Sequence, residues 1–159
     1  MGSPERDLRP YESLSLRLND SYMRLEILPR TELTLRLIQT LDGGARRRAV
    51  DIAAEIDSSA DYVARLVAPL TRAGWVRSVP GPIGGHELIA DLDDVSVLDL
   101  INVVEGDFDA DRCVMADRPC PAPEPCALHD AWIPARDAMT ARLASTPLSS
   151  LTTCSEVFS

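Results

Sequence analysis

The sequence predicts a mainly helical α+β fold, and three observations lead to that prediction. Apolar residues recur at helical spacing in three short segments between residues 31 and 73. Two strand-like runs, 75–79 and 86–90, flank the turn sequence PGPIGG. A proline-rich stretch with three cysteines then precedes a long helical pattern over 128–144. We therefore expect a winged helix-turn-helix domain, followed by a metal-binding loop and a long dimerisation helix.

Composition and charge narrow the class of protein. The 159 residues are 45% hydrophobic, which suits one domain with appendages. The sequence contains no apolar run of about 18 residues, the length that a membrane-spanning helix needs. No signal peptide is recognisable either, so we expect a cytoplasmic protein without a membrane partner. The net charge is −9, but residues 46–81 carry six Arg against four acids and form the one positive segment. The sequence contains no recognisable nucleophile–base motif and no glycine-rich phosphate loop, so we do not expect an enzyme.

Three regions follow from the order of these patterns. Residues 1–22 contain Pro4 and Pro10 and are expected to form an N-terminal arm. Residues 23–92 are expected to form the winged helix-turn-helix region. Residues 93–159 are expected to hold an acidic linker helix, the cysteine loop and the dimerisation helix.

The first three helices are predicted from apolar spacing and from the residues that begin and end them. The first spans 31–41, with Thr31 as its N-cap candidate and glycines after it. The second spans 49–56. The third spans 60–73, where Ser59 belongs to the capping turn and Gly74 is the expected C-cap. Pro69 inside the third helix predicts a kink or a broken turn.

Two further helices are expected in the acidic half. One lies within 95–104, capped by Asp94 or Ser96 and ended by Gly106. The other spans 128–144, and Pro134 either kinks it or lies in its first turn. Its apolar residues recur at steps of three and four, which suits packing either in a dimer or in the core: Trp132, Ala135, Met139 and Leu143.

The segment CVMADRPCPAPEPCALH carries the residues most typical of a metal site. Six residues separate Cys113 from Cys120, five separate Cys120 from Cys126, and His129 follows Cys126 by three positions. Thiolates are soft ligands that suit iron–sulfur clusters, zinc and Cu(I). The prolines between them exclude a regular helix, so we expect a loop. Zinc in a Cys3His site, disulfides and unligated structural thiols are the alternatives, and Cys154 is expected to be inert.

Several pieces of the sequence, in their order and spacing, resemble the IscR/NsrR-type family of winged-helix, dimeric iron–sulfur transcription regulators. The resemblance runs from about residue 23 to residue 151. It rests on the following pieces: MRL (23–25), RAGWVRSV with the glycines after it (72–88), VSVLDLINVVEG (95–106), the three cysteines, CALHDAW (126–132) and TPLSSL (146–151).

The resemblance implies a cofactor and its ligands. Cys113, Cys120 and Cys126 would hold a 2Fe–2S or 4Fe–4S cluster, and His129 stands where the iron–sulfur-biogenesis regulators have a fourth ligand. Nitric-oxide sensors of the family take the fourth ligand from an acid near the N-terminus of the partner subunit, and Glu32 resembles that acid. The implied function is a DNA-binding regulator, a repressor by expectation, whose cluster senses nitric oxide, redox state or cluster status.

The resemblance also implies a DNA interface and a homodimer on double-stranded operator DNA. Ser59, Tyr62 and Arg65 fall where the third helix reads DNA, and Gly84 and Gly85 belong to the wing. Arg46 and Arg47 suit contacts to phosphates. The family wing usually reads RGxxGG, whereas this chain reads PGPIGG and lacks that Arg. The competing hypothesis is therefore a metal-binding winged-helix scaffold protein that binds no specific DNA.

Overall fold

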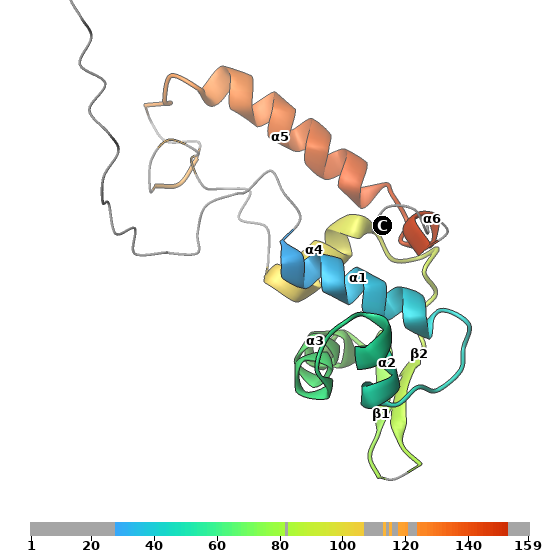
Figure 1. Ribbon diagram of the computed structural model, residues 1–159. Coiled ribbons are helices and arrows are strands. Elements are labelled where there is room, and N and C mark those ends of the chain that lie inside the picture. The colour runs from blue at the N-terminus through green and yellow to red at the C-terminus, as the bar shows by residue number, and fades with distance from the viewer. Residues whose placement is uncertain are drawn as a thin grey trace, which may run out of the picture.

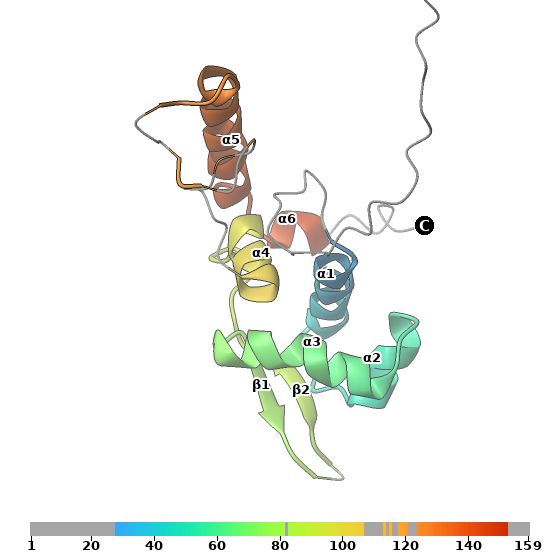
Figure 2. The ribbon, with the colours of Figure 1, turned by 90° about the vertical axis from the view of Figure 1, so that its left-hand side faces the viewer.

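A computed structural model describes residues 28–81, 83–106, 113, 115, 118–120 and 124–152. The expected N-terminal arm, the MRL segment, part of the cysteine loop and Cys154 lie outside the described residues. Figures 1 and 2 show a helical body with a two-stranded hairpin projecting at one end and a long helix at the other. The elements in chain order are α1 (Pro29–Leu41), α2 (Ala49–Glu55), α3 (Ala60–Arg72), β1 (Val76–Val79), β2 (Gly85–Leu88), α4 (Val97–Glu105), α5 (His129–Ala144) and α6 (Ser149–Thr152).

Helix α1 starts two residues earlier than the sequence predicts, so Thr31 as its N-cap is wrong. The N-cap is Leu28, and Pro29 occupies the first helical position, where its missing N–H costs no hydrogen bond. Thr31 is instead buried, and its hydroxyl donates a hydrogen bond to the carboxylate of Glu105 on α4. The hydroxyl therefore ties two helices together instead of capping one.

Helix α3 begins at the predicted Ala60 but ends at Arg72, one residue earlier than predicted. Its C-cap is therefore Ala73, and Gly74 follows the cap. Ser59 is the N-cap, and its hydroxyl accepts a hydrogen bond from the Tyr62 N–H at 3.2 Å. At the other end Gly74 has φ +78°, and Trp75 N–H donates to the carbonyl of Leu70 at 2.9 Å. This is the Schellman arrangement, which glycine favours because it lacks a Cβ. Pro69 does not break the helix: it lies in its last turn and is buried.

The hairpin after α3 is the expected wing. Strands β1 and β2 pair antiparallel, with Arg77 opposite Glu87 and Ser78 opposite His86. Residue Arg47, ahead of α2, adds an isolated bridge to His86 through two backbone hydrogen bonds of 2.9 and 2.8 Å. A Cβ at Gly85 would lie 2.5 Å from the Arg47 carbonyl oxygen, so this close approach requires glycine.

Helix α4 begins after one of the two predicted capping residues and extends to Glu105, directly before the predicted Gly106. Of the two capping candidates, Ser96 is the N-cap, and it forms a capping box with Asp99. Gly106, with φ +97°, follows the last helical residue. Beside the start of α4, the segment that follows α5 returns to the body: Leu148 N–H donates to the Val95 carbonyl at 2.8 Å.

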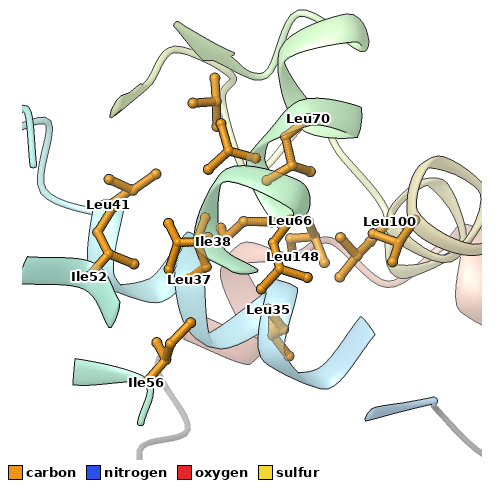
Figure 3. Close-up of a cluster of buried hydrophobic side chains, with 14 of the residues drawn as sticks. Leu35, Leu37, Ile38, Leu41, Ile52, Ile56, Leu66, Leu70, Leu100 and Leu148 are labelled. Carbon is orange, nitrogen blue, oxygen red and sulfur yellow. The ribbon is translucent and has the colours of Figure 1, made fainter. Parts of the chain in front are cut away.

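One apolar core holds the body together (Figure 3). Leu37, Ile38 and Leu70 are fully buried, and α4 and Leu148 complete the same core. In contrast, no residue of α5 is buried, and the helix extends away from the body in Figures 1 and 2. Among the described residues, no helix is both long and apolar enough to cross a membrane.

Candidate metal centre and nucleic-acid interface

The described part of the cysteine loop and the start of α5 bring four candidate donor atoms together in two pairs. The Sγ atoms of Cys113 and Cys126 lie 3.6 Å apart, although 13 positions separate these residues. The Sγ of Cys120 lies 3.2 Å from Nδ1 of His129, the first residue of α5. A backbone hydrogen bond of 3.0 Å from His129 N–H to the Cys126 carbonyl fixes the turn between the second pair and the first.

The environment of Cys120 favours its neutral thiol in the absence of a metal. Burial is the main cause that raises the pKa of Cys120, and the negative charges of Cys113 and Cys126 raise it further. The guanidinium groups of Arg136 and Arg118 act in the opposite direction. Three sulfurs therefore interact electrostatically at this site, and a bound cation would replace the thiol protons.

The two pairs do not form a site for a single metal ion. The described residues include no group of three or more His, Cys, Asp or Glu side chains that could hold one metal ion. Two pairs of donors suit a two-metal centre better than a single ion. In a 2Fe–2S cluster each iron takes two protein ligands, whereas a structural zinc takes four around one point. The donor types and the pairing therefore fit a two-iron cluster.

Glu32, the other candidate ligand, lies in the first turn of α1 and is partly buried. Within the described part of one chain, no hydrogen bond or ion pair joins Glu32 to the thiols. Of the two candidate fourth ligands, His129 is therefore the one that lies beside a cysteine of the same chain.

The predicted base-reading residues of α3 differ in their exposure. Tyr62 packs partly against the core, whereas Arg65, three positions later, is exposed. Arg65 makes no ion pair with any residue in the described part of the chain. The hydroxyl of Ser59 is already engaged in capping α3. Arg65 is therefore the predicted residue whose charge is free to meet another molecule.

The arginines before α2 are paired with carboxylates. Arg46 lies 3.3 Å from Glu87, Arg47 lies 2.6 Å from Glu55, and Arg48 lies 2.9 Å from Asp51. These pairs are exposed or partly exposed, so solvent screens them and they contribute little to stability. A phosphate would have to compete with these carboxylates for the guanidinium groups.

Sequence reasoning missed three arginines. Arg77 shares the Glu87 carboxylate with Arg46, at 3.0 Å, and the register of the hairpin would have pointed to this pair. The positive charges of Arg118 and Arg136 partly offset the burial that raises the pKa of the Cys120 thiol. No periodicity could have placed Arg118, because it lies in an irregular loop.

Comparison with known proteins identifies the family. A family model named Rrf2, described as an iron-dependent transcriptional regulator, matches residues 32–153. The chain belongs to the Rrf2 family. This finding confirms the resemblance at the level of the family, and Rrf2 is a family of transcriptional regulators and not of enzymes.

Two curated relatives illustrate the family. This Rrf2 chain is 34% identical over 93 residues to the HTH-type transcriptional regulator CymR of Bacillus subtilis, a match that covers 58% of this chain and 62% of CymR. It is 33% identical over 107 residues to the regulator IscR of Photorhabdus laumondii, covering 67% and 65% of the two chains. The chain therefore spans about half to two thirds of the length of the curated relatives it matches.

Solved structures agree with the winged helix-turn-helix Rrf2 fold. The structure titled as CymR (YrzC), the global cysteine regulator of B. subtilis, superimposes with a TM-score of 0.66 at 29% identity, and it covers 84% of this chain and 100% of that one. The structure titled T. potens IscR has a TM-score of 0.59 at 22% identity, and it supports the fold alone. The predicted mainly helical fold with a two-stranded wing is thus confirmed.

Proposed function

We propose that this Rrf2-family protein is a DNA-binding transcriptional regulator, with an iron–sulfur cluster that controls its binding to operator DNA. The observation that carries the proposal is the pairing of Cys113 with Cys126 and of Cys120 with His129. Thiolate and imidazole ligands are suited to iron–sulfur chemistry. A bound cluster would supply a centre that changes with oxidation, nitric oxide or cluster loss.

The same pairing supports a 2Fe–2S cluster over a 4Fe–4S cluster or a zinc ion, with His129 over Glu32 of a partner subunit as fourth ligand. The comparisons leave the cofactor open, because the family is described as iron-dependent whereas CymR is named only as a transcriptional regulator. Support for a cluster in this protein comes from its three cysteines and from the contact between His129 and Cys120.

The DNA-binding half of the proposal rests on α3 and the wing. Arg65 is exposed on the outer face of α3, where a bidentate contact to guanine suits its guanidinium group. The wing has no Arg at its tip, so we assign most of the base recognition to Arg65 and Tyr62, with Arg46, Arg47 and the Gly84–Gly85 backbone at the phosphates. Such a protein would act in the cytoplasm.

The proposed link between the two halves is α5 in a homodimer. His129 is both a proposed ligand and the first residue of α5, so ligation would fix the start of this helix. No residue of α5 is buried within one chain, which leaves its surface available to pack against a second copy. Two recognition helices must lie about 34–36 Å apart to enter one face of DNA. A small change at the start of α5 would therefore alter operator affinity.

An anaerobic preparation tests the proposal. The protein should be coloured and contain iron and sulfide, and Cys113→Ser, Cys120→Ser or Cys126→Ser should each abolish the colour, because an alkoxide is a poor substitute for a soft thiolate. His129→Ala should shift the visible spectrum, while Glu32→Ala should leave it unchanged. Protein that holds zinc without sulfide would exclude the cluster.

Gel shifts with promoter fragments, with and without cluster, test the control of DNA binding. Binding to specific fragments should differ between the two forms. If neither form binds any promoter of the source genome at low salt, the protein is a metal-binding scaffold and the regulator proposal fails.

A further inference from the structure

Arg118 joins the two arms of the cysteine loop at two points. Its carbonyl oxygen accepts a hydrogen bond from the Cys113 N–H at 3.0 Å. Its guanidinium group donates a hydrogen bond to the carbonyl oxygen of Glu124 at 2.9 Å. The first contact holds the backbone of the first cysteine, and the second holds the backbone two positions before Cys126. Arg118 thus bridges the segments that carry the two sulfurs found 3.6 Å apart.

Two of the described loop residues cannot donate backbone hydrogen bonds. Pro119 and Pro125 have no backbone N–H, so they cannot donate the hydrogen bonds that order an ordinary turn. Of the loop residues that the structure describes, Cys120 is buried, whereas Arg118, Pro119 and Pro125 are exposed. One guanidinium group offers five N–H donors in a rigid plane, and it can therefore replace missing backbone contacts.

We propose that Arg118 is a positioning residue that holds Cys113 and Cys126 facing each other before any metal or cluster binds. This inference rests on the proposed function, because it assigns the preorganisation of the proposed cluster site to a residue that is not a ligand. It makes a separate statement about the contacts within the chain itself, because Arg118 bridges the segments whose Sγ atoms lie 3.6 Å apart. Metal binding would then spend little free energy on ordering the loop.

The effective concentration of the two thiols measures this preorganisation without any metal. In a buffer of reduced and oxidised glutathione, the thiolate of one cysteine attacks glutathione disulfide and releases one reduced glutathione. The thiolate of the other cysteine then displaces the second, so two protein thiols become one disulfide and one glutathione disulfide becomes two thiols. The equilibrium constant of this exchange has units of concentration, and it rises when the two thiols are held together.

The experiment uses the full chain, reduced and freed of metal with a chelator. Alkylation of free thiols and mass spectrometry of the peptides give the fraction of Cys113–Cys126 disulfide. Arg118→Ala should lower the effective concentration about tenfold, the scale of one charge-assisted hydrogen bond. Arg118→Lys should recover part of the loss, because an ammonium group also donates to a carbonyl. Arg142→Ala removes the same charge from the far end of α5 and should change nothing.

Two results would overturn the inference. One is an Arg118→Ala protein within about twofold of the wild type, which is below the effect of one hydrogen bond. The other is an equal loss in Arg142→Ala. Reconstitution of the wild type with iron and sulfide separates the two proposals. If no cluster forms, the proposed function fails while the thiol equilibrium still decides the role of Arg118. If a cluster forms and the equilibrium ignores Arg118, the present inference alone fails.

Discussion

The body of the molecule and its α5 arm are held in place by different interactions. The body comprises α1 to α4, the wing and Leu148, and its apolar side chains form one buried core. The arm comprises the described cysteine-loop residues and α5, and within it Cys120 is the one buried residue. Apolar burial is the main interaction that stabilises the body. The arm depends on specific contacts, which makes it the part whose order a metal or a second copy can change.

The largest expected effect is on the body. Leu37→Ala removes a fully buried side chain from α1 and should lower the free energy of unfolding by about 2–5 kcal/mol. Met139 on α5 is only partly buried, so Met139→Ala should lower the free energy of unfolding far less. Urea titrations of both variants measure this difference. If both variants lose the same free energy, the arm belongs to the cooperative core and the contrast between the regions is wrong.

Arg65→Ala should separate DNA reading from folding. The variant removes an exposed guanidinium group from α3, so its unfolding should match the wild type. Specific binding should weaken about tenfold or more, because a bidentate contact to guanine contributes about 1–3 kcal/mol of discrimination.

Arg46→Ala is the matched comparison for Arg65→Ala. Arg46 should act on phosphates, so its loss should weaken binding to all sequences and lower the salt slope by about one unit. Gel shifts over a range of salt concentrations distinguish the two arginines. A uniform loss in Arg65→Ala would contradict its role in base reading.

Ser96→Ala tests the capping box of α4 and should cost about 1 kcal/mol of stability. Helix α5 offers the contrast, because its N-cap Leu128 makes no side-chain hydrogen bond. Ser145→Ala at the end of α5 is the control and should have a smaller effect on thermal unfolding. An equal loss in both would show that the cap has no special weight in the body.

The smallest expected effect is a pH dependence from His86 in the wing. Burial lowers the pKa of His86 below 6.5, and its Nδ1 lies 2.9 Å from the Ser78 hydroxyl. The unfolded chain therefore takes up this proton first as the pH falls. The stability contribution is complete above 6.5 and is lost as the pH falls through the lowered value. His86→Asn should flatten the fall in melting temperature over this window, and an unchanged fall would assign it to other groups.

The sequence alone determined the elements of the body. Apolar spacing placed the helices, the turn PGPIGG placed the wing, and Ser59, Gly74, Ser96 and Gly106 marked the ends of α3 and α4. These signals are local, because capping and helical periodicity involve residues a few positions apart. They could be read without knowing what packs on what.

Only the tertiary structure decided where distant residues meet. Thr31 looked like a cap, but its hydroxyl bonds Glu105, 74 positions away. Arg46 and Arg47 were predicted to contact phosphates, whereas packing places the carboxylates of Glu87 and Glu55 beside them. The cysteines and His129 were predicted as donors from their types, whereas their division into two pairs, and the position of Arg118 between the loop's arms, depend on the path of an irregular loop. No periodicity encodes such a path, because long-range contacts set it.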